Sequence, residues 1–525
     1  MRHLILSAAI PALLLAACAG GPARPRADAG EVVVSTNDSR PPHFPADLTP
    51  AGVRAADDHL ALEEVDGAEA MAFVRASNEK ALAALTGDRR YETFRRQAEA
   101  ILTATDRIPS PSFLGDGIGN FWQDAANPKG VWRRTTLDSY RSGDTRWETL
   151  IDVDALAKAE GKDWVWKGAD CLAPDETRCL VYLSDGGKDA VVVREFDTTT
   201  KAFVDGGFVL PEGKHRIEWL DRDTLLVATD FGPNTLTESG YPFIVKSLKR
   251  GQTLAQATEV YRGDIGDGGY GVSPSVYRDG NGDILAVLIH RPLDTFRAET
   301  WQLIEGRAVK LGLPERVNVH GAMRGGSATD LVLSIDEAWR GHPAGSLLRY
   351  GINELRSDQV SLSNAAKLIF QPTDRQSVEA VAVFDDRVAV AINDNVRGRL
   401  SVFADLGEWG WAERQVAVPD NSAVSLGDRS RSQGALFVSS ENFLTPTVLG
   451  LLDVEFAIGR READVAASPN SIEQLRAAPA KFDASTHITE QFEATSSDGT
   501  KIPYFVVRPR DLAMDGSAPT IIYGY

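Results

Sequence analysis

The sequence contains one near match to the turn that carries a serine nucleophile. That turn has the pattern Gly-x-Ser-x-Gly between a strand and a helix, and Asp and His follow later in the chain. Residues 325–329 read Gly-Gly-Ser-Ala-Thr, so the closing glycine is missing, and strand-like segments surround them. We therefore interpret Ser327 as a loop residue. His290, His320 and His342 are scattered through the same region, and we interpret them as core or loop residues.

Two glycine-rich segments have the letters of ligand-binding motifs. Residues 266–271 read Gly-Asp-Gly-Gly-Tyr-Gly, but Val-Ser-Pro at 272–274 cannot open the helix whose N-terminus would meet a pyrophosphate. Residues 279–283 have the spacing of the first calcium ligands, but His290 stands where a bidentate Glu is needed, so a hairpin turn is favoured. No His and Glu pair has the spacing of a zinc site. We expect no cofactor and no metal.

These segments lie in a long region of short strands, from residue 118 to residue 455. Runs rich in apolar and β-branched residues recur there, for example at 179–183, 224–228 and 284–289, with Gly, Asp and Pro between them. Many short strands at a spacing of about 8–12 residues indicate a sandwich, a barrel or a propeller. Roughly 335 residues, at about 40–50 residues per four-stranded blade, give about seven blades. The pattern therefore predicts a mainly β chain with a seven-bladed β-propeller.

Other segments flank this region. Residues 19–56 are rich in proline and poor in large apolar groups, so a flexible tether is expected. Apolar residues recur at helical spacing over 68–85 and 91–104, which predicts a helical arm within residues 57–117. Residues 456–483 are interpreted as a connector.

The C-terminal segment, 484–525, is expected to begin with a β-hairpin. Residues 491–495 and 502–507 are rich in β-branched and aromatic residues, and Asp498-Gly499 between them suits a tight turn. Residues 518–525 then form an apolar run typical of a strand buried on both faces. Because the 525 residues supply no later neighbour for it, we expect this strand to be exposed, and trimming at about Asp453 to improve solubility.

The first 18 residues indicate export. A short positive start is followed by an apolar segment, 4–17, which is too short to span a bilayer as a stable helix. The segment ends in Leu-Ala-Ala-Cys, which resembles a bacterial lipobox, so Cys18 is the expected lipidation site. The alternative is an ordinary secretory signal with a chance cysteine. On the first interpretation the protein is a periplasmic lipoprotein, tethered to the membrane by its N-terminal lipid.

Two cysteines remain after the signal, Cys171 and Cys179. Their separation, with Pro-Asp-Glu at 174–176 between them, suits a disulfide across the turn that joins two strands, and disulfides persist in exported proteins. Two free buried thiols are the alternative.

Charge and composition exclude one class of partner. The chain has 43% hydrophobic and 25% charged residues, as in ordinary globular proteins, and its length allows two or more domains. Its formal net charge of −18, with no cluster of Lys and Arg, argues against a nucleic-acid partner.

Several segments resemble the prolyl oligopeptidase family of serine peptidases. Residues 496–507 (Ser-Ser-Asp-Gly-Thr-Lys-Ile-Pro-Tyr-Phe-Val-Val) and 519–525 (Pro-Thr-Ile-Ile-Tyr-Gly-Tyr) are similar to the entry into the catalytic domain of that family. Residues 120–125, 128–137 and 189–197 resemble its first propeller blades, and residues 62–67 resemble the start of its N-terminal arm.

The resemblance implies a propeller inserted into an α/β-hydrolase domain, of which residues 484–525 are the first strands of an incomplete domain. The arm would pack on that domain. In the family, the Ser, Asp and His of the triad follow the point that corresponds to Tyr525. Tyr525 itself matches the tyrosine whose hydroxyl stabilises the oxyanion.

The resemblance also implies an exported, monomeric serine peptidase that hydrolyses short peptides, with cleavage after proline as one specificity. The propeller of such enzymes limits substrate size. Without the triad, the 525 residues by themselves are expected to be inactive. The alternative hypothesis is a non-catalytic, membrane-tethered propeller that acts as a binding or scaffold module.

Overall fold

The computed structural model describes residues 59–64, 66–325, 328–356, 366–455 and 472–524. Contacts divide the chain into two compact units, one up to Leu102 and one from Thr103 onward. Cys18, the expected lipidation site, lies outside the described residues, as does Tyr525. No helix among the described residues is long and apolar enough to cross a membrane.

The N-terminal unit is helical, as the sequence predicts. A short 3₁₀ helix, η1 (Leu60–Glu63), precedes α2 (Ala68–Thr86) and α3 (Tyr91–Leu102). Alanine-rich, proline-free sequence favours α2, and ion pairs of Arg95 with Glu92 and Glu99 lie one turn apart on α3. Large apolar side chains remain exposed on both helices, among them Phe73, Leu82, Leu85 and Leu102.

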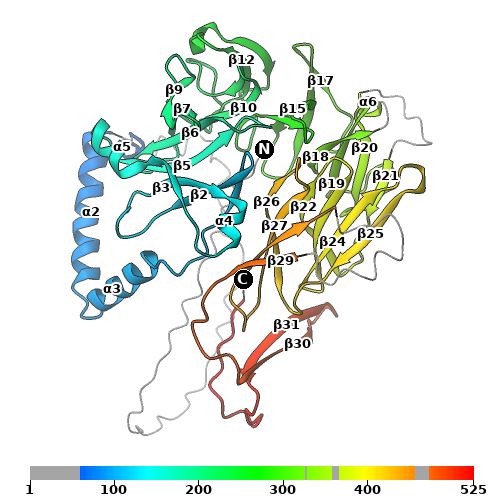
Figure 1. Cartoon of the computed structure of the whole chain (residues 1–525). Helices are drawn as coiled ribbons and strands as arrows, with labels where there is room; N and C mark the ends of the chain where they lie inside the picture. Colours follow the sequence, from blue (N-terminus) through cyan, green and yellow to red (C-terminus); the bar gives the residue numbers. More distant parts are fainter. Residues whose placement is uncertain (1–58, 65, 326–327, 357–365, 456–471, 525) are drawn as a thin grey trace, which may run out of the picture. The chain divides into compact units, whose positions relative to one another are not determined.

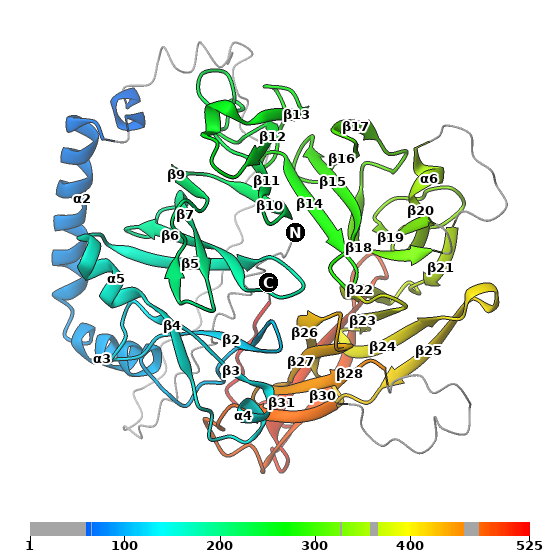
Figure 2. The same ribbon diagram turned by 45° about the horizontal axis from the view of Figure 1, so that its top comes forward.

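Within the described residues, the larger unit contains a two-stranded hairpin and seven larger antiparallel sheets, six of four strands and one of five, so the predicted seven-bladed propeller is confirmed. Figures 1 and 2 show the blades following one another in chain order around a common centre. Blades 1 to 3 consist of β1 (Ser112–Leu114), β2 (Gly117–Trp122), β3 (Val131–Thr136) and β4 (Glu148–Asp152); β5 (Trp164–Cys171), β6 (Arg178–Asp185), β7 (Val191–Asp197), β8 (Ala202–Phe203) and β9 (Val209–Gly213); and β10 (Arg216–Asp221), β11 (Thr224–Ala228), β12 (Ile244–Lys249) and β13 (Thr258–Arg262).

The remaining four blades have four strands each. They are β14 (Ser273–Arg278), β15 (Ile284–Pro292), β16 (Ala298–Ile304) and β17 (Arg307–Lys310); β18 (Val317–Gly325), β19 (Ala328–Ile335), β20 (Leu347–Gly351) and β21 (Ala366–Phe370); β22 (Gln376–Val383), β23 (Arg387–Asp394), β24 (Arg397–Asp405) and β25 (Trp411–Val416); and β26 (Ala423–Ser430), β27 (Ala435–Glu441), β28 (Val448–Asp453) and β29 (Ile472–Ala477).

Short helices occur in the connections of this unit, and the sequence reasoning missed them because each is brief. They are α4 (Leu137–Arg141), α5 (Val153–Glu160), η2 (Leu254–Gln256), α6 (Ile352–Leu355) and η3 (Gly407–Trp409). The longest, α5, begins where the Asp152 side chain accepts a hydrogen bond from the Ala155 N–H, and it ends at Gly161 in the left-handed conformation.

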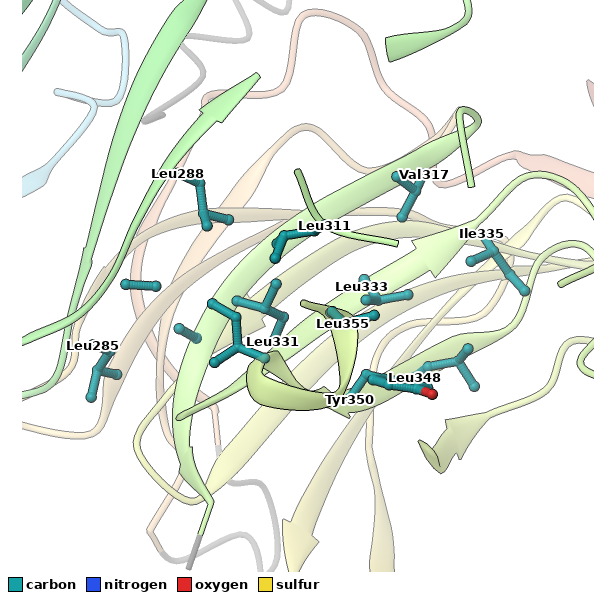
Figure 3. Packing of buried hydrophobic residues seen from close by; sticks show 13 residues of the cluster. Leu285, Leu288, Leu311, Val317, Leu331, Leu333, Ile335, Leu348, Tyr350 and Leu355 are labelled. Carbon is teal, nitrogen blue, oxygen red and sulfur yellow. The ribbon is translucent and has the colours of Figure 1, made fainter. Parts of the chain in front are cut away.

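The hydrophobic core lies between neighbouring blades. In blades 4 and 5, Leu288 of one sheet and Leu331, Leu333 and Leu348 of the next belong to one buried cluster, which Figure 3 shows from close by. Both faces of the middle strands are covered in this way, and β11 is nearly all buried. This explains why the strands contain continuous apolar runs.

The propeller extends beyond the predicted limits of 118 and 455, since its first strand starts at Ser112 and its last ends at Ala477. The first strand has only three residues and follows two prolines, so its pattern is short. The last strand, β29, lies inside the predicted connector and is rich in charged and polar residues. Its pairing with β28 is a tertiary feature that the local pattern does not show.

The predicted C-terminal hairpin is confirmed, while the strand after it is not formed. The hairpin comprises β30 (His487–Thr495) and β31 (Lys501–Pro509), with Gly499 at φ 88° in the turn. Residues 518–524 are not in a strand, and Ile521 and Ile522 are 89% and 92% exposed. The expectation of a strand here is therefore wrong for the described residues, because no neighbouring strand pairs with this run.

Candidate functional site at the axis of the propeller

The first strand of each blade lies nearest the centre of the ring. These strands contact one another from blade to blade, as β10 with β14, β14 with β18, β18 with β22, β22 with β26 and β26 with β1. Successive antiparallel strands reverse direction, so turns alternate between the two faces of the ring. We call the face that carries the turns after the first strands the first-turn face. The opposite face carries the turns after the second strands.

Contacts on the first-turn face cross between blades that are not neighbours. The Gly280 N–H in the blade 4 turn donates to both carboxylate oxygens of Asp385 in the blade 6 turn, at 3.1 and 3.0 Å. Arg431 of blade 7 forms an ion pair with Asp385 at 2.8 Å and donates to the Ala322 carbonyl of blade 5 at 3.0 Å. Three turns are thereby joined around Asp385.

A second carboxylate, Asp279, organises the same turn of blade 4. It is buried and accepts hydrogen bonds from the Asn281 and Asp283 N–H groups, each at 3.0 Å, and from Arg324 Nε of blade 5 at 2.9 Å. Burial alone would raise the pKa of Asp279, but these hydrogen bonds hold it below its ordinary value. The carboxylate is therefore ionised near neutral pH.

Blade 2 also reaches this turn. A Cβ atom added to Gly282 would lie 2.5 Å from Cδ of Pro174, in the turn between β5 and β6. Gly282 has φ of 88°, a left-handed conformation that glycine adopts readily. Its lack of a Cβ atom also allows the close approach of Pro174. Turns of blades 2, 4, 6 and 7 and the end of β18 in blade 5 are thus linked by contacts across the first-turn face.

The β30–β31 hairpin lies against the opposite face. Gln491 Nε2 donates to the Asn395 carbonyl at 2.7 Å, in the turn between the second and third strands of blade 6. Glu493 forms an ion pair with Arg375, and the rings of Phe505 and Phe443 are 5.2 Å apart. The chain therefore leaves the propeller on the face opposite to the cross-linked turns.

One family model matches most of this unit. It is that of the prolyl oligopeptidase N-terminal β-propeller domain, and it covers residues 42–463. The chain belongs to the prolyl oligopeptidase family.

Two peptidases are similar over most of the chain. An uncharacterized peptidase of Sinorhizobium fredii is 40% identical over 480 residues, which are 90% of this chain and 63% of that protein. An uncharacterized peptidase of Rickettsia prowazekii is 27% identical, over 88% of this chain and 64% of that protein. The chain thus spans less than two thirds of the length of these relatives.

Solved structures give the same fold. A post-proline cleaving enzyme from Rickettsia typhi has a TM-score of 0.74 and 25% identity, with 90% of this chain and 67% of that chain covered. Oligopeptidase B from Leishmania major has a TM-score of 0.60 and 17% identity over 80% of this chain and 55% of that chain, which shows the shared fold.

The catalytic positions expected from the prolyl oligopeptidase family are not among the described residues. Tyr525 and Ser327 both lie outside them. Of the histidines, His290 lies in β15, and His342 makes backbone hydrogen bonds with Trp339 in a turn. His320 contacts Ser334 Oγ at 2.9 Å between β18 and β19, at the point where the register of these two strands of blade 5 shifts.

Other sequence-predicted positions have clear structural roles. Cys171 and Cys179 lie opposite each other on β5 and β6 and are joined by a disulfide. Residues 279–283 form the hairpin turn between β14 and β15, and residues 266–271 form a loop. No group of three or more His, Cys, Asp or Glu side chains in the described ranges could hold a metal ion.

Asp385, Arg431 and Arg324 are the residues of this site that sequence reasoning missed. Asp385 and Arg431 are ordinary charged residues in turns and Arg324 is one near the end of β18, and the sequence carries no local signal for contacts across a ring.

Proposed function

We propose that the chain is the propeller-containing portion of an exported serine peptidase that hydrolyses short peptides, with cleavage after proline. The membership of the prolyl oligopeptidase family carries this proposal. Two relatives are named peptidases, and the solved structure from Rickettsia typhi is that of a post-proline cleaving enzyme. The nucleophile, Asp and His of the family pattern correspond to positions after Tyr525.

The propeller would act as a size filter for peptides. Support comes from the contacts around Asp385, Asp279 and Gly282, which link five blades on the first-turn face. The β30–β31 hairpin leads the chain away on the other face, where we place the hydrolase domain. Peptides would then reach the active site through the face that carries the hydrolase domain and not through the first-turn face. The exposed apolar residues of α2 and α3 would be covered by the hydrolase domain.

The activity can be tested with benzyloxycarbonyl-glycyl-prolyl-p-nitroanilide. We compare the 525-residue chain with a product that continues in frame past Tyr525 to the length of the relatives. The longer product should release p-nitroaniline and the 525-residue chain should not. Hydrolysis by the 525-residue chain would refute the proposal that the nucleophile, Asp and His correspond to positions after Tyr525. A natural stop directly after Tyr525 would favour the non-catalytic binding module instead.

Export and lipidation at Cys18 are a separate part of the proposal. Labelling of the cells with radioactive palmitate should mark the wild-type chain, and Cys18→Ser should abolish the label. An unlabelled wild-type protein released freely into the periplasm would instead indicate an ordinary secretory signal.

A further inference from the structure

A cleft lined by arginine and tryptophan lies where the first and last blades meet. Its volume is about 480 Å³, and the segment before β1, strands β2 and β3 and the end of β29 contribute to it. Its lining includes three arginines and two tryptophans, Arg107, Arg133, Arg476, Trp122 and Trp147. The cleft is separate from the contacts around Asp385.

The indole rings hold the guanidinium groups in place. The Arg133 guanidinium carbon lies 4.8 Å from the Trp122 ring centre and 4.2 Å from that of Trp147. Arg107 stacks on the Trp122 ring at 4.6 Å. Trp122 is buried, and its indole N–H donates to Asp124 at 2.9 Å, so this platform is fixed before any ligand arrives.

Hydrogen-bonding capacity remains available on Arg133. Its Nε donates to Asn120 Oδ1 at 2.8 Å, while its two terminal nitrogens have no acceptor among the described residues. Burial lowers the pKa of Arg133 to about 10. A planar guanidinium with free terminal nitrogens is suited to bidentate binding of a carboxylate or phosphate.

The charge balance of the cleft is positive, although the chain carries a net charge of −18. None of Arg107, Arg133 and Arg476 forms an ion pair with a carboxylate of the described residues. Two acidic residues line the same cleft. Asp106 is neutralised by Lys481 at 2.8 Å, and Asp144 lies exposed in a turn.

We propose that this Arg–Trp cleft binds a small anion through a carboxylate or phosphate group. Such a ligand would dock on the free nitrogens of Arg133, with Arg107 and Arg476 supplying further positive charge. Arg476 of the last blade already donates to Thr145 Oγ1 of the first blade at 2.9 Å and to the Tyr140 carbonyl. A bound anion therefore adds a link at the seam where the ring closes, and it stabilises the folded protein by mass action.

The proposal is tested on the 525-residue chain with three probes at constant ionic strength, because salt screens exposed charges. The probes are inorganic phosphate, N-acetylphenylalanine and the uncharged N-acetylphenylalanine amide. The readouts are the thermal unfolding midpoint and the tryptophan fluorescence. One or both anions should raise the midpoint saturably and change the fluorescence, and the amide should do neither. A response to phosphate alone or to the carboxylate alone identifies the source of the anion.

Variants separate the cleft from general charge effects. Arg133→Met should weaken binding of the active anion by at least about tenfold, since it removes the main charge-assisted contacts. Arg262→Met is the matched control, because Arg262 pairs with Glu259 on blade 3 and should leave binding unchanged. Asp144→Asn should tighten binding by about two- to threefold, because a nearby negative charge is removed.

Equal anion responses in wild type and Arg133→Met would overturn the proposal, as would a saturable response to the amide. If Arg133→Met does not fold, the anion affinity of Asp144→Asn, compared with that of the wild type, is the test of the proposal. Unchanged or weaker anion binding by that variant would then refute the site.

Discussion

The backbone N–H of Gly280 and the carboxylate of Asp385 are hydrogen-bonded although their blades are separated by a third. Contacts between neighbouring blades are the rule in a ring, because each sheet buries its face against the next. A contact that skips a blade requires the turns to converge near the axis. The Asp385 carboxylate therefore links turns that meet near the axis of the ring. Removing this carboxylate tests whether the link contributes to the stability of the protein.

Asp385→Ala should lower the free energy of unfolding by about 2 kcal/mol, since the Gly280 N–H loses its acceptor and the largely buried Arg431 loses its carboxylate partner. Asp386→Ala is the control one residue away. Asp386 pairs with Arg387 but is 62% exposed, so its loss should cost less than about 0.5 kcal/mol. Urea unfolding followed by fluorescence measures both variants, and equal losses would show that the cross-blade contact adds nothing.

Gly282→Ala should destabilise the protein more than Gly143→Ala. Both glycines have a left-handed backbone, with φ of 88° and 85°, so both variants incur a similar conformational cost of about 1 kcal/mol. Only the Gly282 substitution places a Cβ against Pro174, while the space around Gly143 is open within 4 Å. Overpacking adds about 1–3 kcal/mol in the first case. Similar unfolding free energies of the two variants would contradict the close approach of blades 2 and 4.

The Asp279 carboxylate should make part of the stability pH-dependent. Its pKa is lowered in the folded protein, so its contribution is present above about pH 4 and is lost as the pH falls through the lowered pKa. The unfolding free energy of Asp279→Asn should accordingly lie well below that of the wild type at pH 6 and approach it at pH 3. A difference that stays constant over this range would show that ionisation of Asp279 has no role.

The stability that the Cys171–Cys179 disulfide contributes can be predicted from the length of the loop that it closes. The disulfide closes a loop with a sequence separation of 8, for which the chain-entropy relation gives roughly 2.5 kcal/mol. The Cys171→Ala/Cys179→Ala double variant should lose about this amount in urea unfolding. Dithiothreitol should shift the wild-type midpoint and leave the double variant unchanged. A wild-type midpoint that ignores the reductant, after its thiols are shown to be free, would mean that the bond does not stabilise the fold.

Local chemistry explains what the sequence could predict. The Asp498-Gly499 turn encodes its hairpin within a few residues, and Cys171 and Cys179 are close enough for the turn between them to set their pairing. The number of blades follows from strand spacing, because each blade is a meander with short connections. All of these features need only neighbours along the chain.

Long-range contacts explain what the sequence could not predict. Gly280 meets Asp385 only because the ring curves back, and Arg133 meets Arg476 in one cleft only because the first and last blades adjoin. Strand β29 pairs through its backbone, while half of its side chains are polar or charged. The side chains at 518–524 favour a strand, but no neighbouring strand pairs with this run. The strand predicted from side-chain propensity is therefore not formed there.

The position of β29 changes where the chain should be shortened. Trimming at Asp453, as the sequence suggested, removes Leu475 from the core and uncovers the edge of β28. A chain that ends at Pro479 keeps blade 7 and loses the exposed Phe492, Ile521 and Ile522. We therefore expect the Pro479 variant to aggregate less than the 525-residue chain, and the Asp453 variant to aggregate more, when each is concentrated and followed by light scattering. If the Asp453 variant is the most soluble of the three, β29 does not complete the last blade in solution.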